Sequence, residues 1–358
     1  MVIAIVGGGN IGTLMAGEFA AAGHEVRVVT SNPPDWCGTV NVLDRGGEIL
    51  VSGELTLVTE NLSKAIDGAD YIWITYPTFM LEKVANDLLP LVEPHQRIGV
   101  VPGNGAEFFF GSHVRKGAVL FGLQRVHSIA RLCERGHSVY MLGRKQELQV
   151  ASLPSTKVNE IAYEVEGLFG IPAIALPHYL AETLTPSNPI LHTSRIRSMF
   201  RNWKPGVYYS RNVLFYEDWD NASSELMLTC DTELQQLCRL LESKMGVDLS
   251  GVKSLKDHYD CSDALAITAK ISNIPAFRGL TSPMREVGPG MWEPDFSSRY
   301  FKADFAYGLK VIVDIAELVE APSSCMREVF EWYEAMSGDG AYFDGMPATF
   351  EEFELLYV

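Results

Sequence analysis

Short apolar runs alternate with helix-like segments through the first half of the chain. The first run, residues 1–6, is apolar, branched and of strand length, and residues 13–22 beyond it are typical of a helix. Further strands are predicted over residues 25–29, 70–76, 97–102, 118–122 and 138–143, and helices over residues 62–67 and 78–89. This alternation predicts an α/β fold built on a doubly wound parallel sheet.

The pattern changes near residue 180, and helical periodicity dominates from residue 223 onward. Apolar residues recur at spacings of three and four from Leu234 to Met245 and again from Phe301 to Val319. The second segment predicts a helix from about residue 300 to residue 320, ended by Pro322. We therefore predict an α/β domain over residues 1–180, a mostly helical domain over residues 181–358, and an active site in the cleft between them.

A glycine-rich turn joins the first predicted strand to the first predicted helix. Its residues are Gly7, Gly8, Gly9, Asn10, Ile11 and Gly12. Gly7 permits a tight turn, Gly9 lets the backbone approach a pyrophosphate, and Gly12 lets the helix pack against the strand. The helix N-terminus adds unpaired N–H groups and a positive dipole end. Because strands both precede and follow this turn, it predicts a Rossmann domain that binds a dinucleotide; a glycine turn without a ligand is the alternative.

Other candidate cofactor residues follow from the expected sheet. Ligands of such sheets bind at the carboxyl ends of the strands, which places Tyr76, Pro77 and Asn104 near the cofactor, although their segments can equally be plain turns. The fingerprint usually has an acidic residue about 20 residues beyond the glycines for the ribose hydroxyl. Residues 29–32 contain neither that acid nor an arginine for a 2′-phosphate. We expect Thr30 and Ser31 to serve the ribose, and the sequence does not choose between NAD and NADP.

Composition and charge narrow the classes of partner. The chain has 358 residues and a formal net charge of −16, which argues against nucleic acid but not against a small anionic substrate. Its six cysteines show neither a C-x-x-C pair nor zinc spacing, so we expect no metal site and reduced thiols in a cytoplasmic protein. We find no signal peptide and no unbroken apolar run of about 18 residues, and therefore expect no membrane association.

His192 is the first candidate for acid–base chemistry. A nicotinamide-dependent reductase needs a proton donor beside the carbon that receives hydride, and positive charge to hold a substrate carboxylate. His192 stands in residues 188–196, where the chain is expected to cross from one domain to the other. A histidine titrates near neutrality and can pass a proton in either direction. It is one histidine of eight, so a structural role is the alternative.

Four blocks give the chain a resemblance, over most of its length, to the opine dehydrogenases, the octopine/nopaline dehydrogenase family. They are residues 7–12, the Asn188-Pro-x-x-His192 segment, residues 248–253 (Asp-Leu-Ser-Gly-Val-Lys), and residues 294–309 with their Arg-Tyr-x-x-x-Asp run. The resemblance implies an NAD- or NADP-dependent enzyme that reduces the imine formed from a 2-oxo acid and the amine of an amino acid. These small molecules are its expected partners, and a monomer or homodimer is expected.

The resemblance also implies that His192 is the catalytic acid and base and that Asp304 orients it. A carboxylate on one ring nitrogen would fix the tautomer and raise the basicity of the other nitrogen. The alternative role for Asp304 is favourable charge in the first turn of the predicted helix.

Several further side chains are candidates for binding substrate or cofactor. We expect Arg299 to contact the cofactor pyrophosphate or a substrate carboxylate, from a position in the cleft just before a helix that begins near Tyr300. This requires residues 294–298 to form a loop. Arg195, with Arg197 and Arg201, is a candidate for substrate carboxylates, and a solvated basic face is the alternative. Trp203 is expected to line the pocket for the amino-acid side chain, with core packing as its alternative role.

Two departures from the family pattern and two competing interpretations remain. Thr193 stands where relatives often carry proline, and Lys302 breaks an acidic pair often seen beside the aspartate. A ketopantoate-reductase-like enzyme would share the two-domain plan, but it usually employs a lysine as the acid. A dinucleotide-binding sensor without chemistry would keep the glycines and would have no need of His192 and Asp304.

Overall fold

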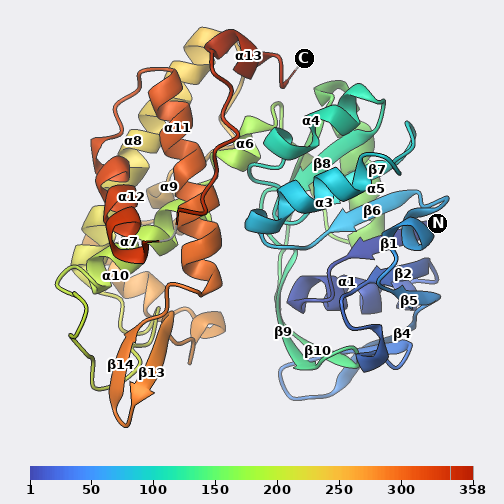
Figure 1. Ribbon diagram of the computed structural model, residues 1–358, viewed down its shortest axis with the longest axis horizontal. Helices are drawn as coiled ribbons and strands as arrows, with labels where there is room; N and C mark the ends of the chain where they lie inside the picture. Colours follow the sequence, from blue (N-terminus) through green and yellow to red (C-terminus); the bar gives the residue numbers. More distant parts are fainter. Residues whose placement is uncertain (339, 358) are drawn as a thin grey trace. The chain divides into compact units, whose positions relative to one another are not determined.

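The chain divides into two compact units, which the computed structural model describes over residues 1–338 and 340–357 (Figure 1). Unit 1 comprises Met1–Thr183 and the C-terminal segment from Leu355, and unit 2 comprises Leu184–Glu354. The segment from Leu355 therefore belongs with unit 1, not with the helical domain to which the sequence pattern assigned it.

Unit 1 is built on the predicted doubly wound sheet, which is confirmed. The sheet has eight strands in the order β12-β11-β8-β7-β6-β1-β2-β5. In chain order they are β1 (Val2–Val6), β2 (Glu25–Val29), β5 (Leu57–Thr59), β6 (Tyr71–Ile74), β7 (Arg97–Val100), β8 (Val119–Leu123), β11 (Leu148–Leu153) and β12 (Ala173–Ala175). Neighbouring strands run parallel except for β11, which is antiparallel to β8. The end of β1 pairs with the ends of both neighbours, because Val6 lies opposite Val29 of β2 and Ile74 of β6.

Helices lie between the strands of unit 1, and the sequence predicted those over residues 13–22, 62–67 and 78–89. They are α1 (Asn10–Ala21), η1 (Pro33–Asp35), α2 (Leu62–Ile66), η2 (Thr78–Met80), α3 (Leu81–Leu88), α4 (Glu107–Arg115), η3 (Ser155–Lys157), α5 (Val158–Phe169) and α6 (Leu180–Thr183). The helix predicted over residues 78–89 begins as the 3-10 turn η2 and continues as α3.

A second sheet of four strands corrects one prediction. Its order is β4-β3-β10-β9, formed by β4 (Ile49–Glu54), β3 (Thr39–Leu43), β10 (Ser138–Arg144) and β9 (Ser128–Glu134). The run at residues 138–143 is therefore a strand, but it lies outside the parallel sheet where the sequence placed it. Helix α1 packs against strands of both sheets, and its buried residues lie on more than one face. A helix that is apolar nearly all round is typical of such a buried position.

Unit 2 is mostly helical. Its elements are η4 (Ser187–His192), α7 (Thr193–Met199), α8 (Asn221–Met245), α9 (Leu255–Tyr259), α10 (Ala264–Ile271), η5 (Pro275–Phe277), β13 (Met284–Gly288), β14 (Met291–Pro294), η6 (Tyr300–Leu309), α11 (Lys310–Leu318), α12 (Ser324–Ser337) and α13 (Phe350–Glu354). The longest helix, α8, begins where the Asp220 carboxylate accepts a hydrogen bond from the Ser223 N–H and ends at Gly246, whose φ is 67°.

The helix predicted over residues 300–320 forms in two parts, with π-helical η6 followed by α11. It begins at Tyr300 as expected. Pro294, predicted to lie in the preceding loop, is the last residue of β14 and pairs with Met284.

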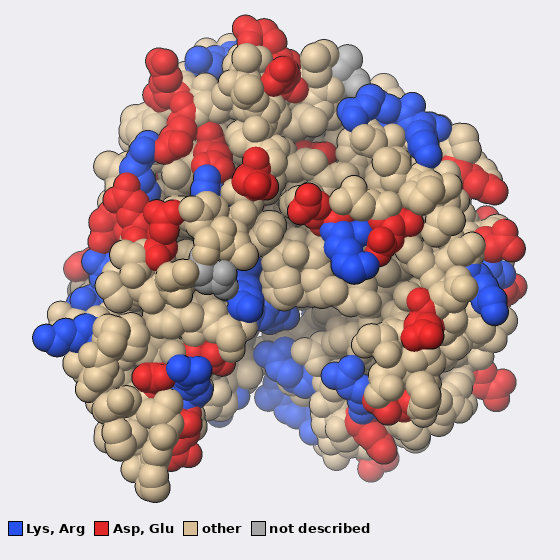
Figure 2. Space-filling model, viewed as in Figure 1, with Lys and Arg blue, Asp and Glu red and all other residues tan. Residues whose placement is uncertain are grey.

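Acidic side chains stand out over unit 2 in Figure 2, in keeping with the net charge. Glu328, Glu331 and Glu334 are exposed along α12. Within the described ranges, no helix has the length and apolar character needed to cross a membrane.

Candidate active site

The glycine turn of unit 1 has the geometry that a dinucleotide needs. Gly9 caps the N-terminus of α1, and a Cβ added there would meet no atom within 4 Å. Space is therefore open where a pyrophosphate would approach the backbone and the helix N-terminus. At Gly12, by contrast, an added Cβ would lie 1.8 Å from the carbonyl oxygen of Gly7, so close packing of helix on strand requires glycine. These residues fit the predicted cofactor.

The other predicted cofactor residues of unit 1 lie at the carboxyl ends of parallel strands. Thr30 and Ser31 follow β2, Tyr76 and Pro77 follow β6, and Asn104 follows β7. Because β2, β6 and β7 belong to one parallel arrangement around β1, these segments share one edge of the sheet. Thr30 is buried and Ser31 is exposed.

Two side chains of the glycine turn contact the protein itself. The Asn10 side-chain oxygen accepts a 2.8 Å hydrogen bond from the backbone N–H of Leu132 in β9, so this amide ties α1 to the second sheet. Ile11 packs, partly buried, against the core. The backbone of both residues stays at the start of α1, beside the open space at Gly9. Trp36, which the sequence analysis did not single out, covers the turn, because a Cβ added at Gly8 would lie 2.7 Å from its ring.

In unit 2, two π-helical segments bring His192 and Asp304 together. His192 is the last residue of η4, and Asp304 lies within η6. The His192 Nδ1 atom is 2.7 Å from the Asp304 Oδ2 atom, and the two side chains are only 10% and 12% exposed. With the carboxylate accepting from Nδ1–H, the neutral imidazole carries its lone pair on Nε2. The predicted proximity of these residues is therefore present in the fold.

Tyr216 completes this cluster and was missed by sequence reasoning. Its hydroxyl oxygen lies 2.9 Å from His192 Nε2, and the residue is 7% exposed. Its ring stacks on Phe277 with centroids 4.1 Å apart. A second tyrosine, Tyr300, places its ring centroid 4.9 Å from that of His192. Tyr216 lies in an irregular segment that carries no recognisable motif, so no sequence signal could have identified it.

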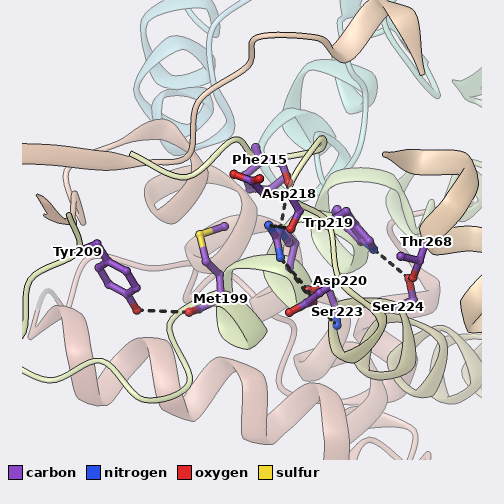
Figure 3. Close-up of polar contacts among 10 residues, drawn as sticks. Met199, Tyr209, Phe215, Asp218, Trp219, Asp220, Ser223, Ser224 and Thr268 are labelled. Carbon is purple, nitrogen blue, oxygen red and sulfur yellow. Dashed lines mark hydrogen bonds and ion pairs between the residues drawn. The ribbon is translucent and has the colours of Figure 1, made fainter. Parts of the chain in front are cut away.

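Arg195 has a different role from the one predicted. The guanidinium is 2% exposed and donates to the carbonyl oxygens of Phe215 and Asp218 at 3.0 and 2.7 Å and to the Ser223 hydroxyl at 3.1 Å. Figure 3 labels Phe215, Asp218 and Ser223, the three residues that accept these hydrogen bonds. Burial lowers the pKa of Arg195 to about 10. A buried cation whose donors serve the chain is a structural anchor, so the predicted contact with a substrate carboxylate is not supported.

The other candidate binding residues of unit 2 differ in exposure and in hydrogen-bond or ring partners. Arg299 is exposed and directly precedes η6, so its guanidinium is accessible at the start of the segment that carries Asp304. Arg197 pairs with Glu328 at 2.6 Å and lies over the Trp332 ring. Trp203 is 9% exposed, and its Nε1–H donates to the Val207 carbonyl oxygen at 2.9 Å. Its ring contacts Phe296, which matches the alternative of core packing.

No group of three or more His, Cys, Asp or Glu side chains that could hold a metal ion occurs among residues 1–338 and 340–357.

Two protein families match different parts of the chain. The model described as NAD/NADP octopine/nopaline dehydrogenase, alpha-helical domain, matches residues 175–337, which include His192 and Asp304. The model described as ketopantoate reductase PanE/ApbA matches residues 3–127, which include the glycine turn.

Individual proteins match over nearly the whole chain. The tauropine dehydrogenase of Arabella iricolor is 27% identical over 367 residues, covering 94% of this chain and 92% of that protein. An octopine dehydrogenase solved with NADH and L-arginine is 24% identical, with a TM-score of 0.81 over 99% of this chain and 94% of its own. A structure of octopine dehydrogenase with NADH and pyruvate has a TM-score of 0.82 at 23% identity, covering 99% and 94% of the two chains. These structural similarities show a shared fold.

Proposed function

Because the chain belongs to the opine dehydrogenase family and is an NAD(P)-dependent oxidoreductase, we propose that it joins a 2-oxo acid to an amino acid. The amine of the amino acid condenses with the oxo group, and the resulting imine is reduced to a secondary amine. The reverse reaction oxidises the secondary amine. The similar octopine dehydrogenase structures hold L-arginine or pyruvate, which supports one amino acid and one 2-oxo acid as the substrate classes.

The observation that carries this proposal is the 2.7 Å contact between His192 Nδ1 and Asp304 Oδ2. The carboxylate holds the ring in one tautomer and stabilises the imidazolium that forms when Nε2 takes a proton. A histidine held in this way can give a proton during reduction and take one during oxidation. Since both side chains are nearly buried, bulk water competes little for that proton.

The cofactor site of unit 1 supplies the other half of the reaction. Bound NAD(P)H provides the hydride that reduces the imine carbon. Residues of the Gly7–Gly12 turn would hold its pyrophosphate, with Thr30 and Ser31 near the ribose and Tyr76, Pro77 and Asn104 at the same edge of the sheet. We retain Arg299 as the group that binds a carboxylate of the substrate or the pyrophosphate, since its guanidinium is exposed and suits either anion.

A matrix of substrates tests this function. The purified protein would be mixed with NADH or NADPH, with each of a panel of 2-oxo acids, and with each of a panel of amino acids. We expect loss of the reduced cofactor's absorbance only when an acid and an amine are both present. The product mass should equal the sum of the two substrates minus water plus two hydrogens. Cofactor oxidation independent of any amine would contradict the proposal.

The competing activity is reduction of a 2-oxo acid alone, which the match of residues 3–127 to ketopantoate reductase favours. In that case the matrix would show turnover without the amino acid, and the product would be a hydroxy acid. Because the ketopantoate reductase match stops before His192 and the octopine/nopaline dehydrogenase match includes it, we favour the condensation reaction.

A further inference from the structure

The hydroxyl of Tyr216 occupies the position next to His192 where a substrate proton would arrive. We propose that Tyr216 is a proton relay, which carries the proton between His192 Nε2 and the substrate nitrogen. The proposal rests on the acid–base role of His192 in the proposed function. It assigns chemistry to a residue that has no part in the resemblance to the opine dehydrogenases.

The first argument concerns which ring nitrogen is available. Asp304 holds Nδ1 at 2.7 Å, so only Nε2 can exchange a proton with a substrate. Tyr216 places its hydroxyl oxygen 2.9 Å from that same nitrogen. The Phe215 ring also packs on the imidazole in a T-shaped arrangement, with centroids 5.3 Å apart and an interplanar angle of 88°. A proton that leaves Nε2 in this arrangement meets the phenol oxygen first.

The second argument concerns the two protonation states of His192. When Nε2 is unprotonated it accepts a hydrogen bond from the Tyr216 hydroxyl, and when it is protonated it donates one to the same oxygen. A phenol can therefore remain hydrogen-bonded to the ring throughout a proton transfer. No movement of either heavy atom away from the other is required.

Protons and electrons are accounted for in both directions of the reaction. In the reduction, the imine nitrogen takes the Tyr216 hydroxyl proton while the tyrosine oxygen takes the proton from His192 Nε2. The imine carbon receives hydride from the cofactor, the C=N double bond becomes a C–N single bond, and neutral imidazole remains. In the oxidation, the amine proton passes to the tyrosine oxygen, the hydroxyl proton passes to neutral Nε2, the oxidised cofactor would accept the hydride from the carbon, and the C–N single bond becomes C=N.

The third argument is that backbone hydrogen bonds and ring packing fix the position of Tyr216. Its neighbour Phe215 is fixed at both backbone polar groups, since its N–H donates to the Leu280 carbonyl at 2.8 Å and its carbonyl accepts from Arg195. Arg195 also binds the Asp218 carbonyl beyond the tyrosine. The Tyr216 ring itself is stacked on Phe277 and, at 6.3 Å, on Trp219. Withdrawal of the hydroxyl would break this packing, so we favour a relay over a lid that opens for the substrate.

The decisive variant is Tyr216→Phe, which keeps the ring and removes only the hydroxyl. We expect turnover to fall by roughly 10²-fold, the lower range for a positioned acid–base group, with unchanged cofactor affinity. In mixtures of light and heavy water, the wild-type rate should depend on more than one transferred proton and the residual rate of the variant on one. Turnover that stays at the wild-type level or rises would overturn the relay, because Tyr216 would then only cover Nε2.

A matched control is Tyr209→Phe. Tyr209 is half-buried in the same unit and donates its hydroxyl hydrogen bond to the Met199 carbonyl at 3.3 Å, as Figure 3 shows. Loss of this bond should leave turnover and its isotope dependence unchanged. If both variants lose activity equally, the effect on Tyr216 is structural and the relay is wrong.

A measurement on the cofactor-free protein separates the relay from the proposed function. The nitrogen-15 NMR signal of His192 Nε2 should shift in Tyr216→Phe toward that of a nitrogen without a hydrogen-bond partner, and should not shift in Tyr209→Phe. An unchanged signal overturns the relay. If instead the wild type turns over no pair of substrates, or His192→Ala keeps the wild-type rate, the proposed function fails first and the relay fails with it.

Discussion

The guanidinium of Arg195 donates a 3.0 Å hydrogen bond to the backbone carbonyl of Phe215, the residue directly before Tyr216. This contact joins α7, which begins directly after His192, to the irregular segment that carries the tyrosine. Arg195 also reaches the Ser223 hydroxyl in the first turn of α8 and lies over the Trp219 ring at 5.5 Å. One buried cation therefore fixes the spacing between two members of the proposed catalytic cluster.

We predict that Arg195→Met destabilises unit 2. The substitution leaves the carbonyls of Phe215 and Asp218 and the Ser223 hydroxyl without their donor, and each unsatisfied buried group costs about 1–3 kcal/mol. A large fall in thermal midpoint is expected, whereas Arg201→Met, at an exposed position, should change stability by less than about 0.5 kcal/mol. If Arg195→Met instead raised the KM for one substrate at unchanged stability, the carboxylate-binding role predicted from the sequence would be restored.

The proposed roles of His192 and Asp304 give a second prediction. His192→Ala should lower turnover by roughly 10²–10⁴-fold, the usual contribution of a positioned general acid, with little change in cofactor affinity. Asp304→Asn should also slow turnover, because an amide can donate to Nδ1 and favour the wrong tautomer. Steady-state rates with the best substrate pair and calorimetric titration of the cofactor measure the two effects. Wild-type rates in both variants would exclude this pair from the chemistry.

Local sequence signals predicted the strand–turn–helix of residues 1–29 because each of its parts is contiguous in the chain. The second sheet was missed for a physical reason. Most residues of β4 are exposed, so its sequence lacks a buried face, and β3 pairs with β10 across nearly a hundred residues. Pairings of that separation are set by tertiary packing and leave no period in the sequence.

In the candidate site, too, residues in contiguous motifs were predicted, whereas a residue positioned only by tertiary contacts was missed. His192 and Asp304 stand in recognisable blocks, whereas Tyr216 reaches Nε2 only because Arg195 and the Leu280 carbonyl fix its segment. The roles of the arginines could not be distinguished from the sequence, because an arginine that anchors buried backbone and an arginine that binds a ligand are the same residue type. Burial of Arg195 and exposure of Arg299 distinguish them only in three dimensions.

Two glycines of the turn should respond differently to substitution. At Gly9 the backbone lies in the extended region with open space around the position of a Cβ, so Gly9→Val should fold normally and lose dinucleotide binding. Gly12→Ala should destabilise unit 1, because its Cβ would collide with the Gly7 carbonyl. Calorimetric titration with NADH and NADPH, together with thermal unfolding, checks both outcomes. Unchanged affinity in Gly9→Val would remove this turn from the cofactor site.

Unit 1 also contains a buried pair of carboxyl groups that the proposed chemistry does not use. Glu107 opens α4 and is fully buried, with its Oε1 atom accepting hydrogen bonds from the Thr183 hydroxyl at 2.6 Å and the Tyr357 hydroxyl at 3.1 Å. Burial raises the pKa of Glu107 to about 7 and raises the pKa of Glu182, which is equally buried, well above its usual value. The Tyr357 contact fastens the C-terminal segment to this cluster.

These pKa shifts predict that the stability of unit 1 falls as pH rises. Between the ordinary pKa of 4.5 and about 7, folded Glu107 retains a proton that the unfolded chain releases, so the stabilisation is complete below pH 4.5 and is lost as pH rises through 7. Glu107→Gln keeps an oxygen that accepts from Thr183 and Tyr357 but cannot ionise. Wild type should lose up to roughly 3 kcal/mol of its free energy of unfolding over this pH range through Glu107, and the variant should not. Glu182 acts in the same direction, so part of the pH dependence of stability should remain in the variant.

Urea unfolding at pH 5 and pH 8 measures the change. Glu160→Gln is the control, because Lys157 lowers the pKa of that exposed carboxylate and its titration lies below this range. An identical pH dependence in wild type and Glu107→Gln would show that Glu107 titrates normally and that the buried cluster does not couple folding to pH.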